Sequence, residues 1–183
     1  HLLIFLKSKS YLDIVGVDTS IEQVKLIKDK SLNIVRDDIF NFLEKNDNLF
    51  DIIFLVDVIE HLNKEEVLLI LEKCFNALNL NGRIIIRTPN GAGPFSNLYY
   101  FNDFTHEQIF NSNTLKTLFR ISGFRDFKFR EENPIPIGYS ILSSIRYILW
   151  QFIRLIYTSI NIIENGEVEK KIYTKNIIAS AIK

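Results

Sequence analysis

The stretch Ile14-Val15-Gly16-Val17-Asp18 is a short apolar run that ends at a carboxylate, and two later stretches repeat this pattern. The run 32–35 is followed by Asp38, and the run 52–56 is followed directly by Asp57. The segments between the three runs are each long enough to form a helix. Alternating strands and helices of this kind form a mostly parallel sheet, whose ligands bind beyond the carboxyl ends of the strands. The pattern therefore predicts an α/β doubly wound fold with a cleft for a polar, nucleoside-like ligand.

The rest of the chain continues this alternation and then departs from it. Asn63 is a predicted helix cap, and apolar residues recur at three- and four-residue steps until Asn81-Gly82, which we expect to end the helix in the left-handed conformation. Further strands are predicted at 83–87, 124–130 and 173–182. An apolar helical insert at about 134–172 separates the last two, and we expect a single domain over residues 1–183.

Composition excludes some classes of function. The 183 residues carry 22 basic and 22 acidic side chains without a basic patch or stacking motif, so we expect no nucleic-acid partner. The single cysteine, Cys74, falls on the apolar helical stripe. A disulfide framework is therefore excluded, which is consistent with a reducing compartment. Cys74 is interpreted as a small core residue rather than a catalytic one. No metal site is predicted.

The first residues read as the end of a helix, and the chain contains no methionine. This opening segment has neither a helix cap nor the anatomy of a signal peptide. We therefore expect the domain as given to lack its first strand and the glycine-rich loop that follows it, with both lying before residue 1.

The carboxylates at the strand ends suggest contacts with a nucleoside. Asp18 follows the strand at which a carboxylate typically accepts hydrogen bonds from ribose hydroxyls. Such bonds to a charged acceptor contribute about 1.5 to 3 kcal/mol each. Asp37 or Asp38 can accept from the exocyclic amine of adenine while Ile39 packs on the ring. The structural alternatives are that Asp18 caps the following helix and that Asp37 and Asp38 form a solvated turn.

Four stretches together resemble class I S-adenosylmethionine-dependent methyltransferases, namely 15–20, 38–39, 51–62 and 81–90. The resemblance covers residues 1 to about 130 and the final strand, and Glu60-His61-Leu62 is its most specific element. It implies a Rossmann-like methyltransferase fold, in which the last strand is antiparallel and lies between its neighbours.

The resemblance also implies S-adenosylmethionine as the cofactor and assigns residues to it. These residues are Asp18 and Thr19 at the ribose, Asp38 and Ile39 at the adenine, and the backbone around Val56 and Asp57 at the methionine moiety. We expect His61 to brace the loop before the next helix rather than to act as a base.

The long aromatic-rich loop 91–110 is expected to face the methyl acceptor, because loops of this length in compact domains are commonly functional. A hydroxyl acceptor needs a base whose pKa is near neutral, and His106 is the candidate catalytic residue. The aromatic residues 99–101 beside it are suited to a stacking or sealing wall. The alternative is that Asp103 and Thr105 cap a turn and that His106 bonds to backbone.

The apolar segment 137–163 has three interpretations. Polar residues interrupt it too often for a transmembrane span, which needs about twenty predominantly apolar residues. With Arg146 and Arg154, an amphipathic helix can lie on a membrane surface or face a lipid-linked acceptor. A lid over the active site or a homodimer contact is the third interpretation. Its place before the final strand is similar to that in methyltransferases of bacterial cell-surface polysaccharide synthesis.

The function that we predict is methyl transfer from S-adenosylmethionine to a small molecule or glycan, as an O-methylation in polysaccharide biosynthesis. The expected location is cytoplasmic, with peripheral contact with the inner membrane left open. Two alternatives remain at this point: a nicotinamide-dependent oxidoreductase and a non-catalytic Rossmann-like binding module. An antiparallel last strand between its neighbours distinguishes the methyltransferase from the oxidoreductase.

Overall fold

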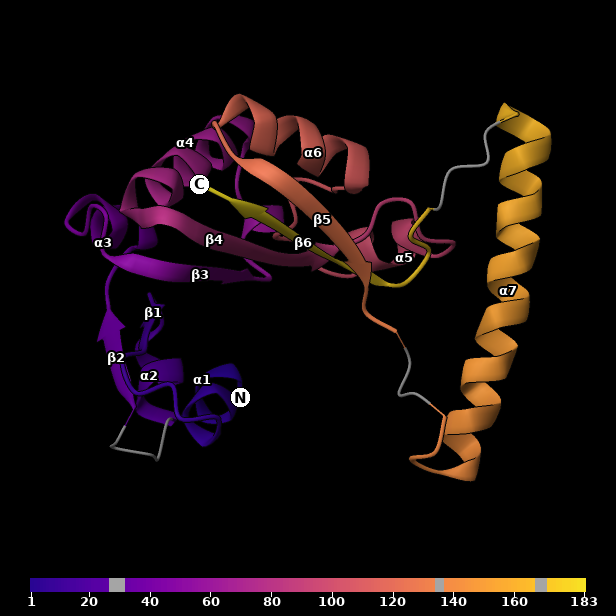
Figure 1. Cartoon of the computed structure of the whole chain (residues 1–183), viewed down its shortest axis with the longest axis horizontal. Helices are drawn as coiled ribbons and strands as arrows, with labels where there is room; N and C mark the ends of the chain where they lie inside the picture. The colour runs from indigo at the N-terminus through magenta and orange to yellow at the C-terminus, as the bar shows by residue number, and fades with distance from the viewer. Residues whose placement is uncertain (27–31, 134–136, 167–170) are drawn as a thin grey trace. The chain divides into compact units, whose positions relative to one another are not determined.

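The computed structural model describes residues 1–26, 32–133, 137–166 and 171–183, which form two compact units, His1–Leu49 and Phe50–Lys183 (Figure 1). Two sequence-based boundaries lie outside the described residues. These are the end, near Lys30, of the helix expected between the first two apolar runs and the start of the insert at Pro134.

The first unit contains two short parallel strands, β1 (Val15–Asp18) and β2 (Asn33–Arg36). Its helices are α1 (Leu2–Ser8), α2 (Ile21–Leu26) and α3 (Ile39–Glu44). The register pairs Asp18 with Arg36. Because the strands are parallel, the residues that follow each of them leave the sheet at the same edge.

The second unit contains a four-stranded sheet in the order β3-β4-β6-β5 (Figure 1). Its strands are β3 (Phe50–Val56), β4 (Leu78–Pro89), β5 (Arg125–Glu131) and β6 (Asn176–Ile182). The pair β3–β4 is parallel, whereas β6 runs antiparallel to both β4 and β5, between which it lies. The predicted α/β class and the predicted place and direction of the last strand are confirmed.

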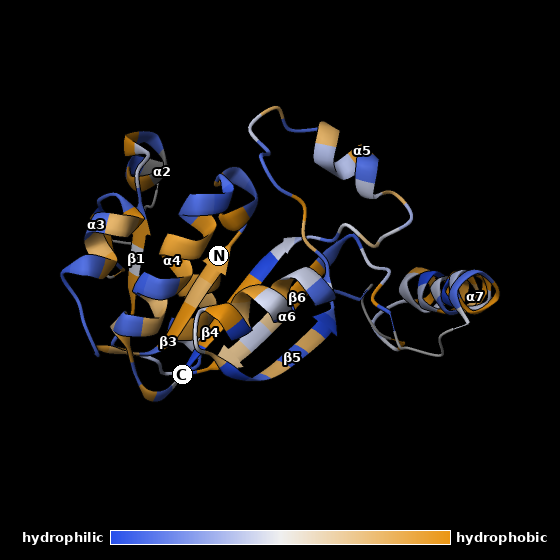
Figure 2. Ribbon diagram, turned by 90° about the horizontal axis from the view of Figure 1, so that it is seen from above, coloured by the Kyte–Doolittle hydropathy of each residue, from blue (hydrophilic) through white to orange (hydrophobic). Residues whose placement is uncertain are grey.

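Two helices, α4 (Lys64–Ala77) and α6 (Ser112–Ile121), pack on this sheet, with α4 against β4 and α6 against β5 and β6. Alternate residues of β4, Ile84 and Ile86, are fully buried, as are Ile177 and Ala179 of β6. Figure 2 shows apolar residues concentrated in β3, β4 and α4. The core of the second unit therefore lies between the central strands and these helices.

The start of α4 follows the prediction, but its end does not. Asn63 and Glu66 form the predicted capping box. The helix ends at Ala77 rather than at Asn81-Gly82, because Leu78 is extended and pairs with Phe50 of β3. Asn81 does adopt a left-handed conformation with φ of 65°, but it does so within β4.

Three further helices complete the second unit: η1 (Ile59–His61), α5 (Ser96–Phe101) and α7 (Ile141–Asn165). The helical insert that precedes the last strand is thus α7. It begins with Ser140 as its cap and ends at Gly166 in the left-handed conformation. Among the described residues, none of the helices, α7 included, combines the length and the apolar character needed to cross a membrane.

Polar residues of α7 face the rest of the second unit. Ser143 and Asn161 are its buried residues. Arg154 forms an ion pair with Glu131 at 3.3 Å, and the ring centroids of Tyr157 and Tyr173 lie 5.7 Å apart. The aliphatic side chains of α7 and Phe152 are exposed.

Candidate active site

Asp18 lies exposed at the carboxyl end of β1. Its Oδ1 accepts a hydrogen bond from the backbone N of Ser20 at 2.8 Å, so the sequence-based alternative of a local cap is realised at this oxygen. Its Oδ2 has no hydrogen bond to the groups that the structure describes. One carboxylate oxygen is therefore available to a ligand. Thr19, the next residue, is also exposed.

The ends of β1 and β2 border a polar hollow of about 330 Å³. It is lined by Thr19, Arg36, Asp37 and Asp38, which come from the residues at the paired strand ends. The Nε of Arg36 donates to the Thr19 carbonyl at 3.5 Å. The predicted residues Thr19 and Asp38 thus border the same hollow.

Asp38 is the N-cap of α3, and its Oδ1 accepts a hydrogen bond from the backbone N of Phe40 at 2.9 Å. Ile39, which is half-buried, is the first residue of that helix. Asp37 forms an ion pair with Lys45 at 3.3 Å. Asp37 and Asp38 therefore have structural roles of their own, and contact of Asp38 and Ile39 with adenine stays a prediction.

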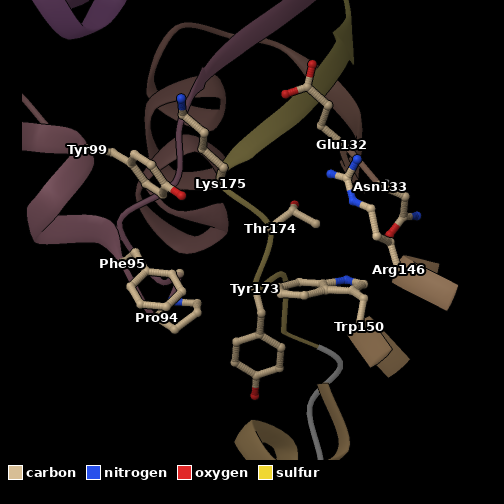
Figure 3. Close-up of a pocket in the computed structure, with 11 residues that line it drawn as sticks. Pro94, Phe95, Tyr99, Glu132, Asn133, Arg146, Trp150, Tyr173, Thr174 and Lys175 are labelled. Atoms are coloured by element: carbon tan, nitrogen blue, oxygen red, sulfur yellow. The ribbon is translucent and has the colours of Figure 1, made fainter. Parts of the chain in front are cut away.

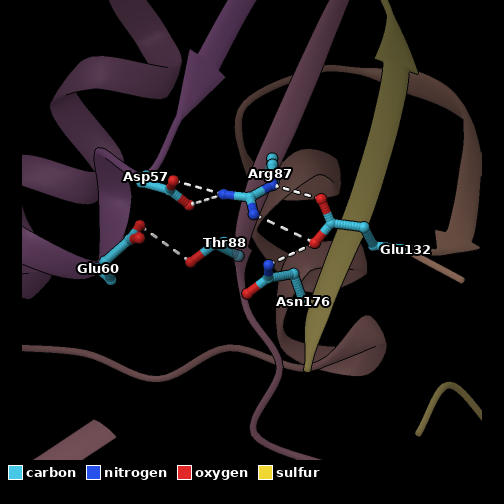
Figure 4. Close-up of polar contacts among 6 residues, drawn as sticks. All are labelled: Asp57, Glu60, Arg87, Thr88, Glu132 and Asn176. Atoms are coloured by element: carbon cyan, nitrogen blue, oxygen red, sulfur yellow. Dashed lines mark hydrogen bonds and ion pairs between the residues drawn. The ribbon is translucent and has the colours of Figure 1, made fainter. Parts of the chain in front are cut away.

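In the second unit, β3 ends at Val56, which is 42% exposed. Asp57 follows with φ of 53°, a left-handed conformation that is uncommon for residues other than glycine. Its backbone N donates to the Arg87 carbonyl at 3.0 Å, and its carboxylate binds the Arg87 guanidinium (Figure 4). The Asp57 carboxylate thus has a protein partner, and contact of the backbone around Val56 and Asp57 with the methionine moiety stays a prediction.

The Arg87 guanidinium also binds Glu132, through Nε at 3.0 Å and Nη2 at 3.2 Å (Figure 4). Asn176 of β6 donates to the same carboxylate. Burial by itself lowers the pKa of Arg87, but the hydrogen bond to Glu132 and the charge of Asp57 outweigh it and raise that pKa. Burial likewise raises the pKa of Glu132, whereas the hydrogen bonds from Arg87 and Asn176 lower it by more.

This network connects the carboxyl ends of β3, β4 and β5 to the start of β6. Sequence reasoning missed it. The signal was an arginine at the end of the apolar strand run 83–87, a place where a charged residue needs a partner.

Glu60 is a buried carboxylate beside the same strand ends and is only 1% exposed. The Thr88 hydroxyl, also buried, donates to its Oε2 at 3.0 Å (Figure 4). Burial raises the pKa of Glu60 above its ordinary value. The buried residues of β4 and of the position just after it thus change from apolar at Ile84 and Ile86 to polar at Thr88 and Asn90.

His61 holds the loop that follows α5. Its Nδ1 lies 2.9 Å from the hydroxyl and 3.3 Å from the carbonyl of Thr105. The backbone carbonyl of Glu60 accepts from the backbone N of Glu107 at 2.8 Å, which fixes the same loop. The side-chain contacts of His61 are thus with a segment distant in sequence, whereas we had expected it to brace the loop before α4.

His106 is half-buried in this loop, and its Nδ1 lies 3.1 Å from the Tyr100 carbonyl. Asp103 accepts from the backbone N of Thr105 at 2.9 Å, so the predicted turn and the predicted backbone contact of His106 are both present. The rings of His106 and His61 have centroids 4.9 Å apart. A catalytic role for His106 stays a prediction.

A pocket of about 310 Å³ lies between the loop after β4, the segment before β6 and α7 (Figure 3). Its aromatic lining includes Phe95, Tyr99 and Trp150, and its charged lining includes Arg146 and Lys175. The Lys175 ammonium lies 4.6 Å from the centre of the Tyr99 ring. Part of the loop expected to face the acceptor, Tyr99 included, thus lines a pocket, whereas His106 is not among its lining residues.

Parallel strand pairs with acidic carboxyl ends, together with an antiparallel last strand between its neighbours, define an α/β enzyme of the Rossmann-like methyltransferase class. A family model described as a methyltransferase domain matches residues 1–128, which is more than half of the chain. The chain belongs to this methyltransferase-domain family. The predicted class is confirmed, and the oxidoreductase and non-catalytic alternatives are not supported.

Solved structures of methyltransferases share this fold. A SAM-dependent methyltransferase from Archaeoglobus fulgidus is 22% identical, with a TM-score of 0.72 over 100% of this chain and 80% of that one. A SAM-dependent methyltransferase from Thermotoga maritima, described as a possible histamine N-methyltransferase, is 16% identical, with a TM-score of 0.63 over 92% of this chain and 72% of that one.

A third structure is phosphoethanolamine N-methyltransferase 2 from Haemonchus contortus in complex with S-adenosyl-L-methionine. It is 17% identical, with a TM-score of 0.59 over 98% of this chain and 45% of that one. No curated protein matches the chain. The comparisons agree with the predicted cofactor, S-adenosylmethionine, and they leave the methyl acceptor open.

Proposed function

We propose that this methyltransferase transfers the methyl group of S-adenosylmethionine to a hydroxyl of a small molecule or glycan, and that the acceptor is the head group of a lipid-linked precursor of cell-surface polysaccharide. The observation that carries the donor assignment is the register of β1 and β2, which places Asp18 opposite Arg36. The residues after both strands therefore share the sheet edge at which ligands of parallel sheets bind.

The residues at this edge fit the adenosine part of the donor. The available Oδ2 of Asp18 is a charged acceptor for ribose hydroxyls, and Thr19 lies beside it. Ile39 offers an apolar surface to adenine, and Asp38 borders the polar hollow. When bound, S-adenosylmethionine supplies a methyl group on a positively charged sulfur.

The pocket beside α7 supports a polar cyclic acceptor. Phe95, Tyr99 and Trp150 provide flat apolar surfaces, and Arg146 and Lys175 provide hydrogen-bond donors at the rim. Such a mixture of aromatic walls and a few polar groups is typical of small-molecule sites. A sugar ring, which has apolar faces and a polar edge, matches this lining.

His106, whose Nδ1 contacts the carbonyl of Tyr100 next to the pocket-lining Tyr99, is proposed to accept the proton of the acceptor hydroxyl. A carbonyl can only accept, so Nδ1 of His106 carries a hydrogen toward Tyr100 and Nε2 keeps its lone pair. The acceptor oxygen bonds to the methyl carbon as the carbon–sulfur bond breaks, and its proton passes to Nε2. The remaining contribution of the chain is to align the two reactants and to exclude water.

The exposed face of α7 supports contact with lipid on the cytoplasmic side of the membrane. Exposed apolar side chains occupy roughly half of its circumference at 100° per residue. They include Leu142, Leu149, Phe152, Leu155, Ile156 and Ile163. A pairing seam between two helices is narrower than this, whereas a broad apolar face suits the lipid interface. Because Arg146 and Trp150 of the same helix line the pocket, a lipid-linked head group would reach the pocket from that surface.

Calorimetric titration of the full chain with S-adenosylmethionine tests the donor site. Loss of two hydrogen bonds to a charged acceptor, at about 1.5 kcal/mol or more each, weakens binding about 100-fold or more in Asp18→Ala. Asp13→Ala, at the opposite end of β1, is the matched control and should bind as the parent does. No heat at saturating donor, or equal affinity in Asp18→Ala, would contradict the donor assignment.

Sedimentation with vesicles of phosphatidylglycerol and phosphatidylcholine tests the lipid contact. Phe152, which is 61% exposed, is changed to Glu, and the exposed Leu68 of α4 is changed to Glu as the control. We expect the parent chain and Leu68→Glu to bind vesicles and Phe152→Glu to remain in the supernatant. A parent chain that forms dimers disrupted by Phe152→Glu, and that does not bind vesicles, would overturn the lipid assignment in favour of a second copy.

A further inference from the structure

Glu60 and His61 of η1 and His106 of the distant loop form a compact group of metal-ligating side chains. Each of the three offers one ligand atom, and these atoms all lie within 4.8 Å of one another. The chain has three histidines, and two of them are in this group. The methyl-transfer scheme above uses only His106 of the three.

The hydrogen bonds around His61 fix which of its nitrogens can bind a cation. The Thr105 hydroxyl donates to Asp103 Oδ1 at 2.7 Å, which uses its one hydrogen. The same hydroxyl lies 2.9 Å from Nδ1 of His61 and must therefore accept there. Nδ1 of neutral His61 thus carries the ring hydrogen, and Nε2 keeps a lone pair.

His106 has the same tautomer, but a different hydrogen bond determines it. Its Nδ1 lies 3.1 Å from the Tyr100 carbonyl, which can only accept, so Nε2 again keeps the lone pair. Backbone carbonyls, and hydroxyls bonded to carboxylates, are the outer partners that typically orient histidines toward metals. Both imidazoles are held for coordination through Nε2.

Glu60 adds an anionic oxygen to these two lone pairs. Its side chain is buried and oriented by the Thr88 hydroxyl at 3.0 Å. Three ligand atoms within 4.8 Å of one another in a partly buried site favour a positively charged partner, because burial of a carboxylate without one is costly.

We propose that Glu60, His61 and His106 bind one divalent transition-metal ion of the Zn²⁺ or Co²⁺ type. Two imidazoles and one carboxylate are a donor set typical of catalytic zinc, and they leave a coordination position open. Tetrahedral coordination at about 2.1 Å places ligand atoms roughly 3.4 Å apart. Separations of up to 4.8 Å therefore require closure by at most about 1.4 Å.

The open position gives this ion a role that rests on the proposed function. A hydroxyl oxygen bound there has a lower pKa, because the cation stabilises the ionised form. With its Nε2 lone pair bound to the ion, His106 could not also take the proton. The acceptor hydroxyl, its pKa lowered by the cation, would then lose its proton to solvent water instead of to Nε2.

Calorimetric titration of the chelator-treated full chain with ZnCl₂, and the visible absorption of its Co²⁺ form, test the site. We expect one ion per chain, with affinity reduced about 100-fold or more in His61→Ala and in His106→Ala. His1→Ala is the matched control for adventitious histidine binding and should retain the parent affinity. Absence of binding, unchanged affinity in both site variants, or loss of binding in His1→Ala would overturn the proposal.

Thr105→Val keeps all three ligands and removes only the hydroxyl that orients His61. We expect it to fold as the parent does and to bind Zn²⁺ about 10- to 100-fold more weakly. Unchanged affinity would contradict the orienting role. Glu60→Gln, which can still accept from Thr88, should lose the Zn²⁺ affinity even where its far-ultraviolet circular dichroism matches that of the parent.

The donor titration separates this proposal from the proposed function. If the metal site is wrong, Zn²⁺ binding is absent while S-adenosylmethionine still binds in an Asp18-dependent manner. If the donor site is wrong, Zn²⁺ still binds in a manner that depends on His61 and His106. If methyl transfer survives removal of the metal by a chelator, Nε2 of His106 acts as the proton acceptor in that reaction and not as a ligand of the ion.

Discussion

Replacement of Asn90 by alanine should loosen the pocket and destabilise the second unit. Asn90 is 1% exposed. Its Nδ2 donates to the carbonyls of Ile172 at 2.8 Å and Thr174 at 3.0 Å, and its Oδ1 accepts from the backbone N of Ala92 at 3.1 Å. One side chain thus joins the loop after β4 to the segment before β6, and both segments line the pocket.

The magnitude follows from these three hydrogen bonds. At a net value of about 1 kcal/mol each, their loss reduces the free energy of unfolding by about 3 kcal/mol. Buried carbonyls left without a donor increase this loss further. For a chain of this length the melting temperature falls by about 2 to 4 °C per kcal/mol, or about 6 to 12 °C in all.

Urea denaturation followed by circular dichroism measures the loss. The emission of Trp150, the only tryptophan, reports on the pocket wall during the same titration. Asn97→Ala, at an exposed position of α5, is the control and should change stability by less than about 0.5 kcal/mol. Asn90→Asp should destabilise at least as much as Asn90→Ala at neutral pH, because its second oxygen would face two carbonyls. A loss below about 1 kcal/mol in Asn90→Ala would refute the reasoning.

Three further outcomes are expected. Glu132→Gln should cost about 0.5 to 1 kcal/mol of stability, because its ion pair with Arg87 is partly exposed. The pKa of Glu132 in the folded state is lowered from 4.5. The difference in stability between the parent and Glu132→Gln is therefore present above pH 4.5 and disappears as the pH falls through the folded pKa. A difference in stability that grows in acid would contradict this assignment. Burial raises the pKa of Cys74 to about 12. A thiol reagent at pH 8 should therefore modify Cys74 only after the protein is unfolded in urea. Rapid reaction of the native protein would show that Cys74 is not in the core. His106→Ala should bind S-adenosylmethionine as the parent does but form S-adenosylhomocysteine about 100-fold or more slowly with any acceptor that the parent methylates, and normal turnover would remove His106 from catalysis.

Several parts of the fold could be predicted because they depend on neighbouring residues. The capping box of Asn63 and Glu66 is complete within four residues, and the apolar stripe of α4 repeats at the helical period. The ends of β1 and β3 could be predicted because each strand is an apolar run that is followed by an acidic residue. The end of α4 was predicted wrongly, because pairing of Leu78 with Phe50 in β3 outweighed the local left-handed signal at Asn81-Gly82.

The candidate site also contains residues that could be predicted from the sequence and contacts that could not. Asp18 and Asp38 were found from their positions after strands, and the structure shows the protein contacts that each already makes. The contacts of Arg87 with Glu132 and of His61 with Thr105 join residues 45 and 44 positions apart, respectively. Such pairs leave no periodic signal, because neither partner's local sequence records where the other will lie.

The sequence alone determined the order of the main strands and helices and the acidic strand ends, because hydrophobic period and caps act over a few residues. Its short motifs carried the family resemblance from which the methyltransferase class was predicted. Only the tertiary structure placed two histidines beside a buried glutamate, tied Asn90 to the segment before β6 and turned the apolar face of α7 outward. These features depend on which side chains meet after the sheet has formed, and on the burial that sets the energy of each contact.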